Sequence, residues 1–459
     1  MNTSATANHP RVVIVGGGFA GLSAAQQFRG TPADVTLVDR RNYHLFQPLL
    51  YQVATGELSP GNIASPLRGI LRGNRNVRTL LGEVVDFDVD KGFVQLASEQ
   101  LPFDYLILAA GSQHRYFGNH TWKQYAPCLK TVDDATEIRR RILNAFEQAE
   151  RAESEAERKQ WMTFVLVGGG PTGCELAGAL AEVAFKTMAK DFRRIDPSKA
   201  RIVLIEPADQ PLQYYPDPLP QRSAAALKKL GVEVLTGKMV VDIDDKRVRM
   251  EPREGGPAEE IPARTVIWAA GVKASPMGQR LADRAGIATE KAGRLPVQQD
   301  CSIAGHPHVF VCGDLAIFHD EEKGELPCLA PVASQMGRHA AKCVSADIAE
   351  TPRKPFDYFD KGSLAVIGRY HAVGTIGKLK LHGIVAWALW LFVHLLYVTQ
   401  FRNRLLVVIQ WGWTYFTHDR SSRLITGDKT DLHTKIKIAD SHQIERPTNA
   451  EDSPSKIPV

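Results

Sequence analysis

Two sets of glycines stand at the spacing that lets a protein backbone approach a phosphate group. Each set is a G-x-G-x-x-G motif that follows a β-branched run and opens a helix rich in small residues. In such a motif the first glycine forms a tight turn, the second admits a pyrophosphate, and the third lets helix and strand pack closely. The glycines are Gly16, Gly18 and Gly21 in VVIVGGGFAGLSAA, and Gly168, Gly170 and Gly173 in FVLVGGGPTGCELA. Two motifs in this setting predict that one chain binds two dinucleotides.

A carboxylate follows each motif at the end of a later strand. VTLVDR ends its apolar run at Asp39, and RIVLIEP ends its run at Glu206. A carboxylate at this position accepts hydrogen bonds from ribose hydroxyls and repels a 2′-phosphate, so Glu206 favours NADH over NADPH. Asp314 follows the buried strand of HVFVCGDLA, beside Gly313. In a flavoenzyme it would accept hydrogen bonds from the ribityl hydroxyls of FAD, with Gly313 keeping the backbone close.

Two further apolar strands end in Ala-Ala-Gly. They are DYLILAAGS, which contains Ala110, and TVIWAAGV, which contains Gly271. Each strand is expected to return the chain to its own nucleotide domain after an excursion of strands. The charged stretch over 131–161 is expected to form a solvated linker helix and a hinge. The predicted fold class is α/β, with two Rossmann-like dinucleotide-binding domains for FAD and NADH.

Composition is that of a large folded enzyme. The chain has 459 residues, of which 44% are hydrophobic and 23% are charged, with a net charge of +5. No block of bases with interleaved aromatics points to nucleic acid. No signal peptide is recognised, so the catalytic part is expected in the cytoplasm. The cysteines lack the paired spacing of a redox disulfide or a zinc cage, so we expect reduced thiols and no metal site.

The C-terminal region predicts membrane attachment. LHGIVAWALWLFVHLLYVTQF (381–401) approaches the length of a bilayer span, and a second apolar segment, LLVVIQWGWTYF, follows it. Aromatic residues on one helical side and flanking bases suit the headgroup interface. These features are Trp387, Trp390, Tyr397, Lys378, Lys380, Arg402 and Arg404. We expect a helix that lies on the lipid bilayer, with one transmembrane helix near 381–401 as the alternative.

Taken together, these features of the sequence resemble those of a known family. NYHLFQPLLYQVATGELSP (42–60), both glycine motifs, GSQHRYFG, TVIWAAGV and VFVCGD are together similar to type II NADH dehydrogenase, the single-subunit NADH:quinone oxidoreductase that pumps no protons. The resemblance covers roughly 11–427. It implies non-covalent FAD, NADH as substrate and a membrane quinone, ubiquinone or menaquinone, as acceptor at the cytoplasmic face of the inner membrane.

The resemblance also assigns roles to individual residues. It implies FAD contacts at Gly16, Gly18, Gly21, Asp39, Ala110, Gly313, Asp314 and Ala333, and NADH contacts at Gly168, Gly170, Gly173, Glu206 and Gly271. Glu175 stands where the family has a glutamate close to nicotinamide, flavin and quinone. It could relay a proton or orient ligands, or it could simply face the helix dipole.

The segment LAPVASQMGRHAAK (329–342) departs from the family's pattern. Many members have Ala-Gln-x-Ala-x-Gln here, but this chain has Pro331 in place of the first Gln and keeps the second as Gln335. Gln335 is therefore the preferred polar contact of the quinone, and the alternative is that it caps a helix or bonds backbone. Glu175 and Gln335 are the two candidate catalytic residues.

The expected domain organisation has six parts. These are a disordered tail (1–10), a first FAD-binding part (11–130), an inserted NADH-binding domain with a linker helix (131–275), a second FAD-binding part (276–350), a membrane-anchoring module (351–430) and a polar tail (431–459). A homodimer through the C-terminal module is left open. Two alternatives to the proposed enzyme are a sulfide:quinone oxidoreductase, with Cys128 and Cys328 as its cysteine pair, and a flavin-containing redox sensor.

Overall fold

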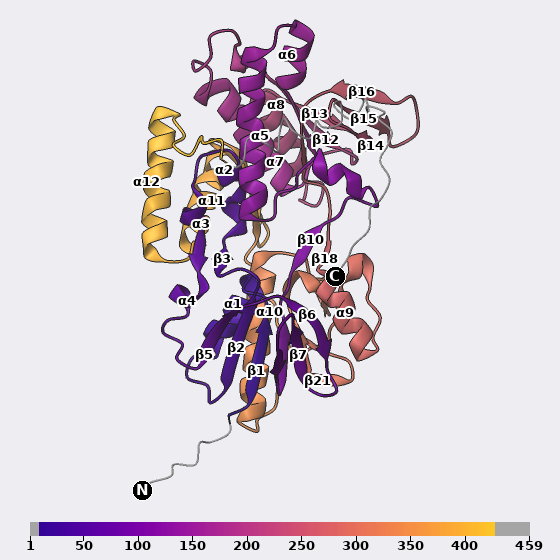
Figure 1. Ribbon diagram of the computed structural model, residues 1–459, viewed down its shortest axis with the longest axis vertical. Helices are drawn as coiled ribbons and strands as arrows, with labels where there is room; N and C mark the ends of the chain where they lie inside the picture. The colour runs from indigo at the N-terminus through magenta and orange to yellow at the C-terminus, as the bar shows by residue number, and fades with distance from the viewer. Residues whose placement is uncertain (1–8, 427–459) are drawn as a thin grey trace, which may run out of the picture. The chain divides into compact units, whose positions relative to one another are not determined.

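Two largely parallel sheets, each built around one glycine motif, organise the chain. The computed structural model describes residues 9–426, and those up to Leu424 form one compact unit. The sheet orders are β20-β21-β9-β1-β2-β5 and β13-β12-β11-β17. Figure 1 shows β1, β2 and β5 of the first sheet in its lower part and β12 and β13 of the second in its upper part. The strands of the first sheet are β1 (Arg11–Val15), β2 (Asp34–Asp39), β5 (Val77–Leu81), β9 (Tyr105–Leu108), β20 (Ser302–Ile303) and β21 (His306–Val311), and those of the second are β11 (Thr163–Val167), β12 (Arg201–Glu206), β13 (Val232–Thr236) and β17 (Thr265–Trp268).

The first sheet shares its core with two helices that are far apart in the sequence. These helices are α1 (Phe19–Gln27) and α10 (Ala330–Ile348). They cross closely because position 337 is glycine: a Cβ atom on Gly337 would overlap the carbonyl oxygen of Ala20. The strands of this sheet come from two segments of the chain, one before and one after the segment that forms the second sheet.

Each sheet is interrupted by an antiparallel excursion, and the strand that ends in Ala-Ala-Gly returns the chain to it, as predicted. β9 pairs with β1, and β17 pairs with β11. A short antiparallel pair of β10 (Ser112–His114) and β18 (Val272–Ala274) connects the two halves. The excursions are β6 (Val84–Asp88), β7 (Phe93–Leu96) and β8 (Gln100–Pro102), then β14 (Lys238–Ile243), β15 (Arg247–Pro252) and β16 (Glu259–Pro262).

The charged stretch over 131–161 is not the solvated linker that we expected. It forms α5 (Val132–Arg151) and α6 (Glu155–Trp161), and α5 buries a full apolar face that includes Ile138, Ile142 and Phe146. A capping box between Thr131 and Asp134 starts α5. α5 is amphipathic: its apolar side packs into the core and its charged side faces solvent. Its high content of charged residues is the reason that the sequence analysis missed the apolar side.

A second core runs from the second sheet into the C-terminal region. It joins α5, α7 (Pro171–Glu182), α8 (Leu219–Lys229) and α2 (Leu50–Ala54) to strands and helices beyond residue 360. Those later elements are β25 (Ser363–Gly368), β26 (His371–Ile376), β27 (Leu379–His382), α11 (Gly383–Tyr397) and α12 (Phe401–Thr417). The C-terminal region is thus packed into the second nucleotide-binding half rather than tethered to it.

The apolar run over 381–401 is shorter as a helix than its length suggests. Leu381 and His382 belong to β27, α11 ends at Tyr397, and Gln400 has a φ of 68° before α12 begins. Within the described residues, 9–426, no helix combines the length and apolar character needed to cross a bilayer. The alternative of a single transmembrane helix near 381–401 therefore has no support in the structure.

The aromatic residues expected at the headgroup interface mostly face the protein instead. Trp390 is 1% exposed and packs against Tyr51 and Trp411. His394 stacks on Trp390 with ring centroids 4.1 Å apart, and burial lowers the pKa of His394 to about 4, so it stays neutral. Tyr397 is half exposed. The sequence pattern located the apolar helix correctly but assigned its tryptophans to the wrong side.

A stripe of apolar side chains on α11 and α12 faces outward in their place. We call it the outer apolar face. Two of the four flanking bases do not border it freely, because Lys380 donates to the carbonyl of Asp217 and Arg404 donates to that of Val398. The exposed members of this face are Ile384, Val385, Phe392, Leu396, Phe401, Leu405, Val408, Ile409, Trp413 and Phe416.

An ion network beyond α12 fastens the C-terminal region to the rest of the chain. Arg420 is 2% exposed and lies 3.7 Å from the Glu57 carboxylate and 3.1 Å from that of Glu182. Its guanidinium also donates to the Thr55 hydroxyl at 2.8 Å. Burial raises the pKa of Glu57, although the charge of Arg420 works in the opposite direction. The segment after α12 therefore supplies a positive charge to two carboxylates of the core.

The two predicted tails lie largely outside the described residues. Residues 1–8 and 427–459 are not described, so the polar tail over 431–459 is untested. Pro10, placed in the first tail by the sequence, already belongs to the fold, because its carbonyl accepts the Asp34 N–H at 2.9 Å.

Candidate functional site

The first glycine motif leaves the space beside Gly18 open to a ligand. Gly16 has a φ of +104°, and a Cβ atom on it would overlap the carbonyl oxygen of Ala109. A Cβ atom on Gly21 would overlap the Gly16 carbonyl, whereas one on Gly18 would meet no atom within 4 Å. Gly18 caps α1, and the first turn of that helix holds no acidic residue. The first and third glycines thus serve the fold, and the second borders free space where an anion suits the helix dipole.

The second motif repeats this arrangement at the start of α7. Gly168 has a φ of +106°, and a Cβ atom on Gly173 would overlap its carbonyl oxygen. A Cβ atom on Gly170 would meet no atom within 4 Å. Pro171 occupies the first position of α7, where its missing N–H and fixed φ cost nothing. Both turns therefore fit a pyrophosphate.

The carboxylates of Asp39 and Glu206 each hold the glycine that directly follows the first glycine of a motif. Asp39 Oδ2 accepts the Gly17 N–H at 2.6 Å, and Glu206 Oε2 accepts the Gly169 N–H at 2.6 Å. The other oxygen accepts the N–H two residues further along, from Arg41 at 2.6 Å and from Ala208 at 2.8 Å. A carboxylate oxygen accepts more than one hydrogen bond, so both groups can still receive ribose hydroxyls. The sequence predicted only that second role.

Asp314 lies in a polar cluster that the sequence did not reveal. It follows β21, and its Oδ2 accepts the Ser112 hydroxyl at 2.5 Å. Lys130 donates to the same hydroxyl at 2.9 Å and lies 3.6 Å from the Asp314 carboxylate. The three residues come from three separate segments, so no local motif could have indicated them.

The remaining residues assigned to FAD and NADH lie around these turns. Gly313 has a φ of +75°, and a Cβ atom on it would lie 3.2 Å from the Cβ of Ala333 at the start of α10. Ala110 borders the Gly16 turn. Gly271 follows β17 with a φ of +70°, and a Cβ atom on it would lie 2.8 Å from the Phe117 ring. The fold therefore brings the residues assigned to FAD to one edge of the first sheet.

Glu175 lies on the face of α7 that packs against β25. Helix and strand meet directly because position 178 is glycine, and a Cβ atom there would overlap the Ile367 carbonyl. Burial raises the pKa of the Glu175 carboxyl to about 8, while a hydrogen bond from the Val366 backbone works to lower it. At neutral pH this carboxyl holds a proton that it can give up.

Two tyrosines lie near enough to feel the charge of Glu175. Burial, and then the charge of Glu175, raise the pKa of Tyr51 well above its usual value. Burial raises the pKa of Tyr215 to about 12, although its hydrogen bond with Ser363, at 2.7 Å, acts the other way. Two phenols that stay protonated therefore lie near Glu175.

Tyr51 also connects this site to the C-terminal helices. Gln52 donates to the Tyr51 hydroxyl at 3.0 Å and accepts the indole N–H of Trp411 at 2.8 Å. The Tyr51 ring lies against Trp390 of α11, with centroids 6.4 Å apart. Tyr51 and Gln52 lie inside the 42–60 segment that carries the family resemblance. That resemblance was the signal in the sequence from which their importance could have been predicted.

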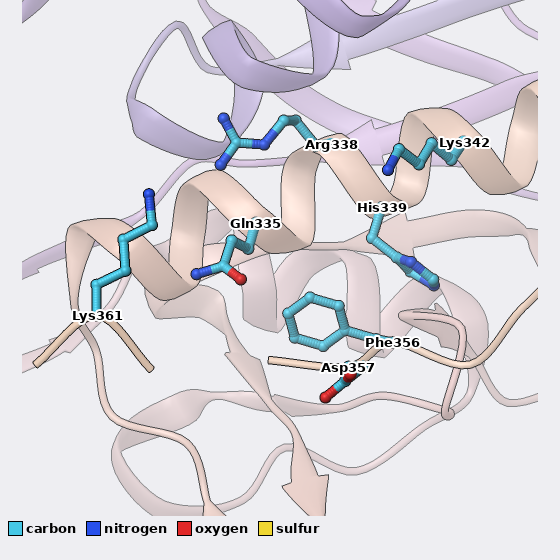
Figure 2. A pocket seen from close by; sticks show the side chains of 7 residues that line it. All are labelled: Gln335, Arg338, His339, Lys342, Phe356, Asp357 and Lys361. Atoms are coloured by element: carbon cyan, nitrogen blue, oxygen red, sulfur yellow. The ribbon is translucent and has the colours of Figure 1, made fainter. Parts of the chain in front are cut away.

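Gln335 binds backbone rather than standing free. Its amide donates to the Phe359 carbonyl at 2.9 Å and accepts the Phe359 N–H at 3.0 Å. Figure 2 shows it on α10 at the edge of a hollow of about 260 Å³ that is also bordered by Phe356. This arrangement supports the second alternative for Gln335, a positioning residue that fixes the loop before β25. Pro331 stands in the first turn of α10, where proline is well tolerated.

All six cysteines are free thiols; Cys128 is buried and Cys328 is exposed.

Comparisons with known proteins agree with this geometry. Residues 10–337 match the family described as "Pyridine nucleotide-disulphide oxidoreductase", and residues 361–418 match the "NDH2 C-terminal domain". The "Type II NADH:quinone oxidoreductase Ndh" of Mycobacterium tuberculosis is 42% identical over 434 residues, which are 93% of this chain and 92% of the relative.

Solved structures share the fold. NDH2 from Plasmodium falciparum, solved in complex with NADH, has a TM-score of 0.83 at 20% identity and covers 91% of this chain and 100% of its own. The sulfide:quinone oxidoreductase of Aquifex aeolicus has a TM-score of 0.66 at 17% identity, over 95% of this chain and 96% of its own. Two findings decide between these two families: the family models match both the 10–337 and the 361–418 parts of the chain, and the Mycobacterium tuberculosis relative is 42% identical over 93% of it. This protein belongs to the type II NADH:quinone oxidoreductases.

Proposed function

We propose that this chain oxidises NADH on its second nucleotide-binding half and reduces a membrane quinone beside Glu175, with FAD on the first half. The observation that carries the proposal is the doubled turn: both motifs present a glycine that borders free space and a carboxylate that holds the loop. Bound FAD would accept a hydride from NADH and pass two electrons to the quinone.

The residues of the chain then have separate tasks. Gly18 and Gly170 admit pyrophosphates, and Asp39 and Glu206 orient the riboses. Asp314, held by Ser112 and Lys130, would bind the ribityl chain of FAD. We assign to Glu175 the transfer of a proton on the quinone side, because this residue of α7 faces β25 and lies near Tyr51.

Steady-state kinetics of the purified holoenzyme test the proposal. NADH oxidation should accelerate at least several-fold when a short-chain quinone is added, and sulfide should leave the flavin oxidised. Flavin bleaching by sulfide would favour the sulfide:quinone alternative. Binding of NADH with no turnover in either condition would favour a redox sensor.

Nucleotide preference depends on Glu206. We expect kcat/KM for NADH to exceed that for NADPH by several-fold or more, because the carboxylate repels a 2′-phosphate. Glu206→Gln should narrow this gap. It should also weaken NADH use, because a glutamine oxygen cannot replace both bonds to Gly169 and Ala208. Asp39→Asn is the matched control, since it alters the other motif and should leave the preference unchanged. Equal use of NADH and NADPH by the unmodified enzyme would contradict the assignment.

Gln335 should matter for one half-reaction only. Gln335→Leu removes both bonds to Phe359 and frees the loop that leads into β25. Stopped-flow absorbance should show slower flavin reoxidation by quinone, by about tenfold, and NADH-dependent bleaching close to normal. Gln335→Glu keeps the acceptor for the Phe359 N–H and should recover part of the rate. Equal losses in both steps would instead indicate a general packing defect.

We further propose that the outer apolar face attaches the enzyme to the membrane as a monotopic protein, on the cytoplasmic face of the cell membrane. Two adjacent helices with a continuous apolar stripe suit insertion parallel to the bilayer surface. The resemblance to proteins that use a quinone supports this, since quinones are held in the lipid phase.

Substitutions on this face should release the enzyme from vesicles. Phe392→Glu combined with Ile409→Glu places two charges in the apolar stripe, and vesicle binding should fall at least about tenfold. Removal of the helices is a poorer test, because Trp390 and Trp411 cover α2. Tyr214→Glu, at a residue that is 92% exposed elsewhere, is the control. Unchanged sedimentation with a shift from dimer to monomer would assign the face to a homodimer.

A further inference from the structure

Three side chains with metal-binding atoms converge beside the connection between the two sheets. They are His114, at the end of β10, Cys128, which bridges to Trp268, and Asp134, in the first turn of α5. Their ligand atoms all lie within 4.8 Å of one another. Because the residues come from a strand, a loop and a helix, no sequence motif predicts the cluster.

His114 is the unusual member. Both of its ring nitrogens are buried, and neither has a hydrogen-bond partner in the described structure. A neutral imidazole has one donor and one acceptor, and a buried polar group without a partner is costly and calls for an explanation. The neighbouring thiol and carboxylate lie close, yet they do not satisfy it by hydrogen bonding.

The spacing of the cluster suits a shared ion. In a tetrahedral zinc site the metal lies 2.0–2.3 Å from nitrogen, oxygen and sulfur, so two ligand atoms stand about 3.2–3.8 Å apart. The ligand atoms here lie within 4.8 Å of one another, so the three side chains would draw together when they bind the ion. Asp134 Oδ2 already accepts the backbone N–H groups of Lys130 and Thr131, which fixes the carboxylate and leaves Oδ1 for a further partner.

Charge in the surroundings permits a cation. A Cys128 thiolate and the Asp134 carboxylate together balance a divalent ion. Two ammonium groups, those of Lys130 and Lys123, act on His114, and that of Lys130 is held by the Ser112 hydroxyl and lies 3.6 Å from the Asp314 carboxylate. Sulfur, imidazole nitrogen and carboxylate oxygen form a mixed ligand set that favours zinc over magnesium or calcium.

We propose that His114, Cys128 and Asp134 form a site for a thiophilic divalent cation of the zinc class, with water as the fourth ligand. When the metal–sulfur bond forms, the thiol proton passes to solvent, and no group changes its oxidation state. Three protein ligands and a water are the composition that zinc has in catalytic sites, whereas structural sites use four protein ligands.

The position of the site gives occupancy a structural consequence. β10 pairs with β18 and forms the connection between the two nucleotide-binding halves. An ion on His114 would fasten this strand to the start of α5. Ser112 and Lys130, each two residues from a ligand, both contact Asp314. Metal bound here would therefore stiffen the connection and the environment of the ribityl contact.

Cobalt titration of the FAD-loaded enzyme tests the site directly. Tetrahedral Co²⁺ with a thiolate ligand absorbs at wavelengths longer than the flavin band, so the two signals are separable. We expect these bands to saturate at one equivalent, to vanish when Zn²⁺ is added, and to be absent in Cys128→Ser. Asp134→Asn, which can keep the helix cap, should weaken binding at least tenfold. Cys328→Ser, at the exposed cysteine, should behave as the unmodified enzyme.

Thermal unfolding supplies a second readout. Zn²⁺ should raise the Tm of the unmodified enzyme and of Cys328→Ser, and leave that of Cys128→Ser unchanged, because only the folded site binds. Cobalt bands that persist in Cys128→Ser would overturn the proposal, as would their absence from the unmodified enzyme. Zinc stabilisation that is equal in Cys128→Ser and Cys328→Ser would assign the effect to other histidines or carboxylates, and would also overturn it.

Discussion

Gly170→Ala should give a yellow, folded enzyme that NADH hardly reduces. Gly170 caps α7, and a Cβ atom there meets no protein atom within 4 Å. The added methyl group therefore does not disturb the fold but enters the space that a pyrophosphate needs. We expect kcat/KM for NADH to fall by about 10²-fold, equivalent to about 2.7 kcal/mol, while the flavin content stays normal. Stopped-flow bleaching and the flavin absorbance of the purified protein measure the two quantities.

Gly18→Ala, the same change in the first motif, should have the opposite pattern. It should reduce the amount of FAD that copurifies with the folded chain. Gly61→Ala is the matched control, because its Cβ atom also meets nothing within 4 Å but lies outside both motifs. Loss of FAD in Gly170→Ala together with normal NADH oxidation in Gly18→Ala would reverse the assignment of the two halves.

Glu175→Gln should slow the quinone half-reaction by about 10²-fold, the usual contribution of one positioned acid or base. The burial that raises the pKa of this carboxyl to about 8 lets it carry a proton at neutral pH and release it within the working range. The pH profile of kcat in the unmodified enzyme should show an ionisation near that value, and the variant should lack it. Glu147→Gln, on the exposed side of α5, is the control. An unchanged profile would leave Glu175 with an orienting role only.

The same carboxyl links stability to pH. Its pKa is raised from 4.5 to about 8 in the folded chain, so the native state holds a proton that the unfolded chain releases. Its stabilising effect is complete below pH 4.5 and is lost as the pH rises through about 8. The Tm of Glu175→Gln should therefore fall less than that of the unmodified enzyme between pH 5 and pH 9. A parallel fall in both proteins would show that the carboxyl is ionised throughout.

The nucleotide-binding turns could be predicted because their chemistry is local. Strand, turn and helix follow one another within about fifteen residues, and each glycine has a geometric reason that the sequence alone expresses. Asp39 and Glu206 were found the same way, since each ends a strand adjacent to its motif strand. Their second role, as acceptors from Gly17 and Gly169, needs atomic distances.

The C-terminal region could be predicted only in part, because contacts with residues far away in the sequence determine which side of each helix faces the core. Hydrophobicity located α11 and α12, but it could not tell which side of each helix faces inward. Trp390 and Trp411 face inward because they contact Tyr51 and Gln52. These partners lie more than three hundred residues earlier in the sequence, so no local pattern indicates them. Gln335 was assigned to the quinone on resemblance, and its bonds to Phe359 depend on a loop with no recognisable pattern.

The late position of Arg420 in the sequence affects how easily an unfinished chain is cleaved by proteases. The buried Glu57 is made long before the arginine that lies beside it, and a buried carboxylate that loses its partner costs about 3–5 kcal/mol. A chain that stops short of Arg420 would leave this carboxylate without its partner. Such chains should be cleaved by proteases sooner than chains that contain Arg420.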